Sequence, residues 1–534
     1  MTRERTNRRP RQRDSDHELG ERDAQWVCIM SIVGLDFGTT KCLGAIWKNE
    51  KPLIVGTGID DSRIPSLVLV LPDGTTLVGS EAQHYRGRYG GGCLSIPGCK
   101  RRMETREGLA WASWHAQRHE VAAMVLQYAK GRVENRAGSP ISTAVLTVPG
   151  CATLSYREAL VKAATIAGIK VDRLLGEAVA AALPFIFSPR CPAECTLASV
   201  TFGGGTLDIA FMGVDKSIGV VEVLGVAGDP KLGGQDFDDI IVDHIVACNP
   251  SARAGQDRLS NAQYEILREV ASQIKTDLSF ASSATIRLTG LFTAQSSSTR
   301  LQDPELTRDA FQKMSQGLLA RVERATEKAL VDVEWKGGRW HGERLVLLNG
   351  GSSRMPAFQD LIRKAFYPCT RIFSGSETSA VDGALMYARI LGGENKSFIV
   401  MDVLPHPMHL GLAGGNSVTV FPRGSHIPTT ETVALSANGD GMRELRIPIF
   451  EGEVEEGGTG RTPYGWICLT GVGQSGRDTP RIDLSIHVDW RMRLGVCAID
   501  QQSKKEIAAR VESAFASAGA RDVEFVYSKH RTAP

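Results

Sequence analysis

The chain lacks the features that mark membrane proteins and nucleic-acid-binding proteins. It contains no run of about 18 uncharged apolar residues, which a membrane-spanning helix would need. It also lacks an excess of charge of either sign, because 62 Lys and Arg residues stand against 60 Asp and Glu residues and the formal net charge is +2. The charge therefore does not indicate nucleic acid or an anionic membrane as a partner.

Neither a disulfide framework nor a secretion signal is indicated. The 11 cysteines are an odd number without paired zinc spacing, and we interpret the closest pair, Cys191 and Cys195, as a coincidence in a surface loop. Residues 1–29 are rich in arginine and acidic residues and have no hydrophobic core of a signal peptide, so we interpret them as a disordered arm. These observations predict a cytoplasmic protein with reduced thiols.

The chain does have 56 glycines, and three polar glycine turns stand out among them. The first, Gly38-Thr39-Thr40-Lys41, follows a short apolar run that carries one carboxylate, Asp36. The others are Gly203-Gly204-Gly205-Thr206 and Gly350-Gly351-Ser352-Ser353. A buried strand that turns sharply at such residues directs backbone N–H groups and hydroxyls at an anion. Each turn alone could be only a turn, but the three together predict one nucleotide held between two lobes.

A strand–turn–strand pattern occurs twice, which indicates an internal duplication. The stretches that begin at Ile32 and at Leu197 each run from a buried strand through a glycine turn into a second strand. At the third turn, the strand 345–348 leads into a helix from Pro356, and the free N–H groups at a helix start make an anion site. These patterns predict an α/β fold with two related lobes.

The composition changes near residue 398. From there no long helical stripe appears, and strands alternate instead, as in Ile482-Asp483-Leu484-Ser485-Ile486, which predicts a compact all-β domain. The predicted organisation is a disordered arm (1–29), a nucleotide-binding domain (30–396), an apolar linker (397–403), a β sandwich (404–502), and a polar tail (503–534) with one short helix at about 504–515.

Two local patterns leave alternatives open, and a third predicts a helix start. The basic cluster Lys100-Arg101-Arg102 fits a solvated turn as well as a phosphate contact. Glu177 precedes the alanine-rich run 178–183, where a carboxylate either favours the helix dipole or acts in catalysis. Ser155 with Glu158 has the spacing of a capping box, which predicts that a helix begins there.

Several motifs occur in one order along the chain. They are Gly34-Leu35-Asp36-Phe37-Gly38-Thr39-Thr40, Phe202-Gly203-Gly204-Gly205-Thr206-Leu207-Asp208, Gly350-Gly351-Ser352-Ser353-Arg354 and, beyond the linker, Phe450-Glu451-Gly452-Glu453. This set resembles the DnaK-type heat-shock chaperone family, the heat shock protein 70 family, over roughly residues 30 to 505. The resemblance implies an actin-like ATPase of duplicated ribonuclease-H-like lobes, followed by an all-β peptide-binding sandwich.

The resemblance also implies roles for individual residues. ATP with Mg²⁺, and K⁺ as a further candidate ion, would lie between the lobes, and phosphoryl transfer there needs mainly positioning and charge stabilisation. Asp36 would hold the magnesium shell, Lys100 would neutralise the γ-phosphate, and Glu177 would order metal-bound water near Asp208. The implied cofactor-binding residues are Gly38, Thr39, Thr40 and Lys41 on the first turn, Gly203, Gly204, Gly205 and Thr206 on the second, and Lys275, Ser279, Gly350, Gly351, Ser352 and Arg354 around the nucleoside.

Coupling between the domains and peptide binding follow from the same resemblance. Pro149 and Arg157 match the family's relay from nucleotide to peptide domain. The implied partners are unfolded or extended protein segments, with a J-domain co-chaperone as a candidate, and neither nucleic acid nor a membrane; the chain is expected to be a monomer. The implied peptide-binding residues are Leu412, Ala413, Leu435, Leu445 and Ile447.

The chain departs from the family pattern at several positions. A second magnesium-side aspartate of the family is here Thr201, and two residues of the adenosine wall are Ser272 and Thr276. Losing a charged group beside the metal typically costs about 3 kcal/mol of transition-state stabilisation. The peptide-side loop 410–414 is short, and the family's helical lid is missing, so we expect fast peptide exchange.

Three functional hypotheses result. The first is a divergent, lidless chaperone that binds ATP, hydrolyses it slowly, and binds extended apolar segments by strand-like contacts. The second is a pseudo-ATPase in which nucleotide sets the conformation without useful turnover, and Thr201 favours it. The third, a sugar kinase or filament protein of the same fold, does not account for the apolar linker and the β domain.

Overall fold

A computed structural model of the protein describes most of the chain from Ile32 to Ser513. The predicted arm (1–29), Ala413 and the polar tail after Ser513 lie outside the described residues. Within those residues, no helix is long and apolar enough to cross a membrane. The described residues are 32–58, 63–86, 93–105, 107–249, 261–288, 303–335, 342–367, 371–394, 398–412, 416–435, 444–453, 462–471 and 482–513.

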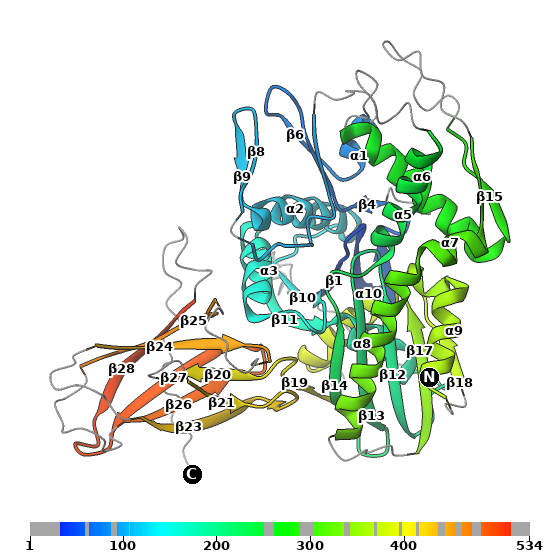
Figure 1. The fold of residues 1–534 in the computed structure, drawn as a ribbon. Helices are drawn as coiled ribbons and strands as arrows, with labels where there is room; N and C mark the ends of the chain where they lie inside the picture. Colours follow the sequence, from blue (N-terminus) through cyan, green and yellow to red (C-terminus); the bar gives the residue numbers. More distant parts are fainter. Residues whose placement is uncertain are drawn as a thin grey trace, which may run out of the picture. The chain divides into compact units, whose positions relative to one another are not determined.

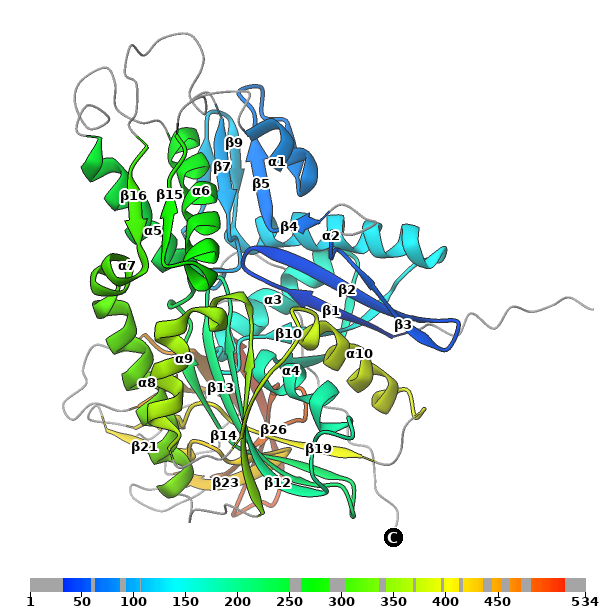
Figure 2. The same cartoon turned by 90° about the vertical axis from the view of Figure 1, so that its right-hand side faces the viewer.

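The first lobe is built on a sheet with the strand order β11-β10-β1-β2-β3, in which β4 also pairs with β2. Val33, Leu35 and Phe37 of β1 pack into one core with α2 and α3. The opposite face of the sheet packs against α10, which lies beside β1 and β2 (Figure 2). The bounds are β1 (Val33–Phe37), β2 (Lys41–Lys48), β3 (Lys51–Val55), β4 (Ile64–Pro65), β10 (Thr143–Val148), β11 (Lys170–Gly176), α2 (Arg118–Ala137), α3 (Leu154–Ile166) and α10 (Ser379–Leu391).

The second lobe repeats this plan, with the strand order β18-β17-β12-β13-β14-β19-β22. In each lobe an antiparallel meander, β1–β2–β3 or β12–β13–β14, has two parallel strands beside its first strand, which confirms the predicted duplication. Helix α8 runs along β13 and β14 (Figure 1). The bounds are β12 (Glu194–Phe202), β13 (Leu207–Asp215), β14 (Val220–Asp229), β17 (Glu343–Asn349), β18 (Arg371–Ser374), β19 (Ile399–Val403), β22 (His426–Ile427), α4 (Glu177–Ile186), α5 (Gly234–Cys248), α6 (Asn261–Phe280), α7 (Arg308–Met314), α8 (Gln316–Trp335), η3 (Gly351–Arg354) and α9 (Pro356–Ala365).

Smaller elements extend both lobes. A three-stranded sheet in the order β6-β5-β7 packs with α1 beside the first lobe, and two hairpins are formed by β8 with β9 and by β15 with β16. Their bounds are β5 (Leu67–Val70), β6 (Thr76–Val78), β7 (Leu94–Pro97), β8 (Leu109–Trp111), β9 (Trp114–Ala116), β15 (Ser283–Thr285), β16 (Glu305–Thr307) and α1 (Ser80–Arg86).

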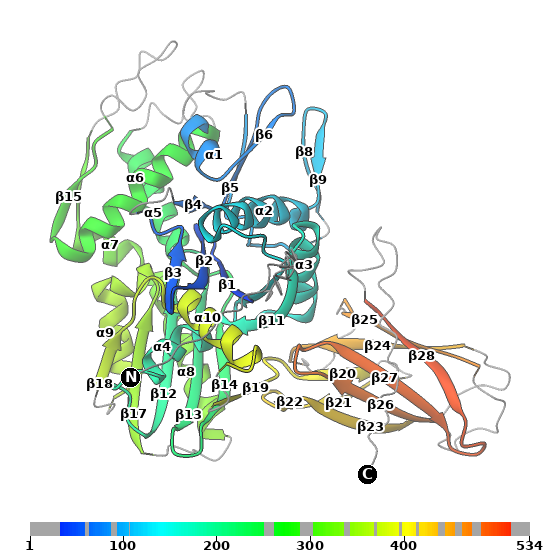
Figure 3. The same cartoon turned by 180° about the vertical axis from the view of Figure 1, so that it is seen from behind.

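The C-terminal part is an all-β domain, as the alternating pattern predicted (Figure 3). Its strand order is β21-β20-β24-β25-β28-β27-β26-β23. The alternation decides which residues enter the core, because Ile482, Leu484, Ile486 and Val488 are all buried while the residues between them are only partly covered. The bounds are β20 (Met408–Gly411), β21 (Ser417–Phe421), β23 (Thr429–Leu435), β24 (Glu444–Glu451), β25 (Gly465–Thr470), β26 (Ile482–Val488), β27 (Leu494–Asp500) and β28 (Glu506–Ser513).

Two sequence predictions about the end of the chain are wrong. The helix expected at 504–515 is the strand β28, which pairs with β25 and β27, so the β domain extends at least to Ser513. Alanine, arginine and glutamate favour a helix, but Ile507 is buried between exposed neighbours, Val511 is half-buried, and the strand that contains them completes the sheet. The predicted linker 397–403 is not contradicted; it contains the strand β19, which pairs with β14 and β22.

The predicted capping box is wrong as well. Thr153, not Ser155, caps α3, because its side chain accepts a hydrogen bond from the Tyr156 N–H. Glu158 is freed from the helix start and accepts hydrogen bonds from the Tyr464 and Ser513 hydroxyls in the β domain. A tertiary contact has therefore taken the side chain that the local spacing assigned to a cap.

Candidate functional site

The three glycine turns lie against one another. A side chain on Gly204 would come within 2.6 Å of the Thr40 methyl group, and one on Gly205 would overlap the Thr39 side chain, so the first and second turns touch across the two lobes. Gly350 has a φ of 83° and packs on the Phe202 carbonyl, which joins the third turn to the second. Only glycine permits these approaches.

A buried ion pair lies near the first turn, since a side chain on Gly98, two residues before Lys100, would come within 3.2 Å of the Thr39 methyl group. The ammonium of Lys100 contacts the carboxylate of Glu177, and the two residues are only 2% and 8% exposed. Asp36 accepts a hydrogen bond of 2.6 Å from the Thr147 hydroxyl, and Asp208 accepts one of 2.7 Å from the Gly150 N–H. The alternative that Lys100 belongs to a solvated turn is thereby excluded.

Negative charge exceeds positive charge in this centre, because the carboxylates of Glu177, Asp36 and Asp208 stand against the single ammonium of Lys100. Burial raises the pKa of Glu177 to about 7, although Lys100 opposes the rise and Asp208 and Asp36 add to it. Burial also raises the pKa of Asp208. Burial disfavours the charged form of Lys100, but Glu177, Asp36 and Asp208 outweigh this, so its pKa is raised. The excess of negative charge favours a bound cation.

Two polar atoms in this centre have no hydrogen-bond partner among the residues that the structure describes. They are Oδ2 of Asp208 and Oγ1 of Thr201, which are both buried. The two residues are paired across β12 and β13. Among the described residues no group of three or more His, Cys, Asp or Glu side chains could by itself hold a metal ion. Because Mg²⁺ keeps several waters and takes one or two carboxylates together with phosphates, the carboxylates present fit it.

The side chains expected around the nucleoside are engaged within the protein. The Lys275 ammonium pairs with Asp238 at 2.6 Å and donates to the Gly234 carbonyl at 2.9 Å. The Ser279 hydroxyl donates to the Lys275 carbonyl at 3.1 Å, and the Ser352 hydroxyl donates to the Gly203 carbonyl at 2.9 Å. These bonds fix Lys275 and Ser352 where α6 and the third turn meet the second turn.

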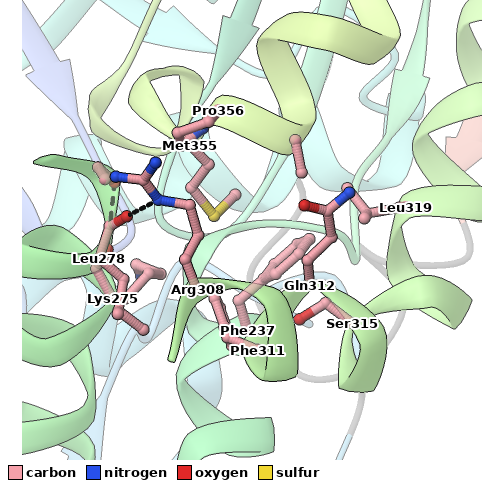
Figure 4. A pocket seen from close by; sticks show the side chains of 12 residues that line it. Phe237, Lys275, Leu278, Arg308, Phe311, Gln312, Ser315, Leu319, Met355 and Pro356 are labelled. Carbon is pink, nitrogen blue, oxygen red and sulfur yellow. Dashed lines mark hydrogen bonds between the residues drawn. The ribbon is translucent and has the colours of Figure 1, made fainter. Parts of the chain in front are cut away.

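A cavity of about 20 Å³ opens beside Lys275 and Ser279, with room for roughly one water (Figure 4). Its remaining walls come from α5, α7, α8 and α9. Helix α7 ends at Met314 and α8 begins at Gln316, so Ser315 lies at the break between these two helices. The further lining residues are Phe237, Leu278, Arg308, Phe311, Gln312, Ser315, Leu319, Met355, Pro356 and Ala357.

The sequence analysis missed Glu377. Its carboxylate lies 2.8 Å from the Lys41 ammonium and 3.0 Å from the Arg354 guanidinium, and thus joins the first turn to the third. The hydrogen bond from Lys41 lowers the pKa of Glu377, and Arg354 contributes in the same direction. A lone glutamate in a Ser-Glu-Thr stretch carries no local signal, so only the fold reveals it.

The residues predicted to couple the domains border this centre, because Arg157 also donates to the carbonyl of Gly150, whose N–H donates to Asp208. Arg157 is buried and donates to the Ala152 carbonyl at 3.2 Å, within the loop that follows Pro149. Arg173 pairs with Asp402 at 2.9 Å and so joins β11 to the linker strand β19. In the β domain, Leu412 is 42% exposed, Leu445 is half-buried, and Leu435 and Ile447 are buried.

The raised pKa of Glu177 predicts a pH-dependent stability. Its folded pKa of about 7 exceeds the unfolded value of 4.5, so the folded state binds the extra proton, and stability falls as pH rises between these values. The shift corresponds to about 3 kcal/mol. We expect Glu177→Gln to flatten the fall in the free energy of unfolding from pH 5 to pH 7, measured by urea titration.

Glu451, whose pKa is also about 7, is present in both the wild type and the Glu177→Gln variant, so its contribution cancels in the comparison. If the free energy of unfolding falls equally steeply with pH in the wild type and in Glu177→Gln, the raised pKa of Glu177 is contradicted.

Comparison with known proteins agrees with the geometry. The family described as Hsp70 protein matches residues 103–531. A chaperone protein DnaK from Mycoplasma mobile is 29% identical over 485 residues, which cover 90% of this chain and 78% of that protein. The family match covers the first lobe from residue 103 onward, the second lobe and the β domain. The chain therefore belongs to the Hsp70 family of chaperones.

Proposed function

We propose that this Hsp70-family chaperone binds ATP with Mg²⁺ between its two lobes, hydrolyses it slowly, and binds extended apolar protein segments in its β domain. One observation carries the proposal most directly. Three glycine turns from two lobes lie against one another, and a buried Lys100–Glu177 pair lies close to Asp36 and to Asp208, whose Oδ2 has no partner among the described residues. Backbone N–H groups, one ammonium and three carboxylates are the groups that a phosphate chain and a divalent cation require.

The residues have separable tasks in this proposal. Asp36 and Asp208 would hold the hydrated cation, which supplies charge neutralisation for the phosphates when it is bound. Lys100 would neutralise the γ-phosphate, and Glu177 would orient a water for in-line attack, a role that its pKa of about 7 suits. Thr201 has a hydroxyl where a carboxylate would polarise that water, and hydrolysis is slow for this reason.

A second candidate is a pseudo-ATPase, in which nucleotide only sets the conformation. The uncharged Thr201, buried beside Asp208, favours it. The two candidates differ in the rate of the chemical step alone. The β domain and the family membership leave the sugar-kinase and filament hypotheses without support.

The partners belong to the same proposal. Leu412 and Leu445 offer apolar surface to an extended segment, whereas the buried Leu435 and Ile447 would support that surface from within. A J-domain co-chaperone, K⁺ as an additional ion, a monomeric state and a cytoplasmic location stay predictions from the resemblance.

Calorimetric titration of the full chain with ATP and Mg²⁺, with and without an apolar heptapeptide, tests the proposal. We expect one nucleotide per chain, and a change in nucleotide affinity of about 5-fold or more when peptide is present, because coupled sites typically differ by 1–3 kcal/mol. The absence of nucleotide binding would overturn the proposal.

Gly205→Val provides the matched control for this titration. A side chain at Gly205 would overlap Thr39, so the first and second turns would be forced apart. The affinity for nucleotide should fall at least 10-fold. The affinity for the peptide, measured without nucleotide, should stay unchanged, because the peptide binds in the β domain. Gly131→Val, inside helix α2 with open space around it, should leave the affinity unchanged if the variant remains folded. If ATP binds but its affinity does not change when peptide is present, the proposed nucleotide site stands and the proposed coupling between the two domains is contradicted.

A further inference from the structure

Two cysteines outside the nucleotide site lie in direct contact. Cys191 is in the loop between α4 and β12, and Cys195 is the second residue of β12. Their sulfur atoms are 3.7 Å apart, so one thiol can donate a hydrogen bond to the other. Cys191 is 4% exposed and Cys195 is fully buried. The spacing that the sequence left as a coincidence is therefore a side-chain pair in the folded protein.

The surroundings of the pair distinguish its two members. Lys216 holds the loop, because its ammonium donates to the Cys191 carbonyl at 2.7 Å and to the Ser188 carbonyl at 3.0 Å. The hydrogen bond from Cys195 lowers the pKa of Cys191, and the charge of Lys216 adds to this against the effect of burial. The pKa of Cys195 is raised, first because its thiol is the donor and then by burial. Cys191 is thus the better nucleophile of the pair.

The loop also places Cys191 just below the surface. Pro189 and Arg190 on one side, and Ala193 and Glu194 on the other, are exposed. Cys191 therefore lies between exposed residues, and 4% of its own surface is open to a small oxidant. Burial raises the pKa of Cys42 to about 12 and raises the pKa of Cys151 well above its usual value, which opposes thiolate formation at these two buried cysteines.

We propose that Cys191 and Cys195 form a redox-active pair that a hydroperoxide oxidises to an intramolecular disulfide. The Cys191 thiolate attacks one peroxide oxygen, the O–O bond breaks, and the leaving hydroxide takes up a proton to become water, which leaves a sulfenic acid on Cys191. The Cys195 thiol then attacks that sulfur, the S–O bond breaks, and a second water leaves with the thiol proton. Two thiols and one hydrogen peroxide thus give one disulfide and two waters, and an external thiol reverses the step.

This inference does not depend on the proposed function. Cys195 lies near the start of β12 and Thr201 near its end, six residues further along, which is about 20 Å at the rise of a β-strand. The disulfide would close the loop between α4 and β12 without touching the nucleotide turns. We therefore expect oxidation to occur equally with and without nucleotide.

The sequence makes the test direct. Trypsin cleaves after Arg190 and after Lys216, so both cysteines fall in the peptide 191–216, which has no other cysteine. The folded full chain is treated with hydrogen peroxide, denatured, alkylated with iodoacetamide and digested. We expect this peptide to lose about 2 Da and to carry no alkyl group, and to carry two alkyl groups after reduction with dithiothreitol.

Two single variants separate the steps of the reaction. In Cys195→Ser the sulfenic acid has no resolving thiol, so dimedone should label Cys191 after peroxide treatment. In Cys191→Ser neither disulfide nor label should appear. Thermal unfolding of both variants verifies that they fold. Full alkylation of peptide 191–216 after peroxide treatment of wild type, or a disulfide that forms only in urea, would overturn the proposal.

Discussion

Replacing Thr201 with aspartate should increase the rate of single-turnover ATP hydrolysis by about 100-fold, because one correctly placed charged group typically contributes that much to the transition state. Thr201 is 7% exposed and lies opposite Asp208 in the sheet, where its hydroxyl has no partner. A carboxylate there would accept a proton or a hydrogen bond from metal-bound water, which a hydroxyl without charge does weakly. The rate is measured with a stoichiometric complex of enzyme, radiolabelled ATP and Mg²⁺.

Thr201→Asn is the matched control, since it has nearly the shape of aspartate without its charge. It should hydrolyse ATP at the wild-type rate, while both variants bind ATP. A wild-type rate that Thr201→Asp does not exceed would contradict the role assigned to this position. If neither wild type nor Thr201→Asp turns over bound ATP, the pseudo-ATPase candidate is favoured instead.

Replacing Lys100 with methionine should destabilise the protein by about 3–5 kcal/mol, the usual effect of leaving one partner of a buried ion pair without the other. Lys100 is 2% exposed and its partner Glu177 is 8% exposed, so water cannot take over the lost contact. Hydrolysis should also be lost, because the γ-phosphate loses its neutralising charge. Urea unfolding followed by circular dichroism measures the first effect.

The destabilisation of Lys100→Met should depend on pH. Lys100 counteracts the effect of burial on Glu177, so without it the pKa of Glu177 rises above its value of about 7. A raised folded pKa gives stability at low pH that is lost as pH rises, and the loss should be larger at pH 8 than at pH 5.5. The double variant Lys100→Met/Glu177→Gln should recover much of the stability at pH 8.

Arg101→Met serves as the comparison for this prediction. Arg101 pairs with Asp236 at 2.6 Å, but the two side chains are 24% and 20% exposed, so solvent screens the pair. We expect a smaller destabilisation with little dependence on pH. Similar losses for Lys100→Met and Arg101→Met would contradict the claim that burial makes the Lys100–Glu177 pair important.

Local sequence patterns were enough to find the three glycine turns of the candidate site. The turns at Gly38, Gly203 and Gly350 are visible because glycine and small hydroxyl residues interrupt apolar runs, and the structure brings the three turns together. The duplicated strand pattern likewise appears in both sheets. The sequence did not decide whether Lys100 lies in a solvated turn or contacts phosphate, or whether Glu177 favours the helix dipole or acts in catalysis. Neither spacing nor composition tells whether a charge is buried.

Long-range contacts decided what the sequence left open or got wrong. Residues 506–513 have helix-forming composition but form β28, because β25 offers an unpaired edge 36 or more residues earlier in the chain. Glu158 matched a cap but bonds to the β domain. Glu377 joins Lys41 to Arg354 from opposite ends of the nucleotide-binding domain, a contact with no counterpart in local sequence.

The sequence by itself determined the family, the two related lobes, the β domain and the three turns, since strand and turn signals depend on neighbouring residues alone. The tertiary structure decided which charges are buried, that Cys191 and Cys195 touch, and that the linker is a strand. The physical reason is the same in each case. Burial, pKa and sulfur–sulfur contact depend on atoms that distant segments bring together, and a local pattern does not contain them.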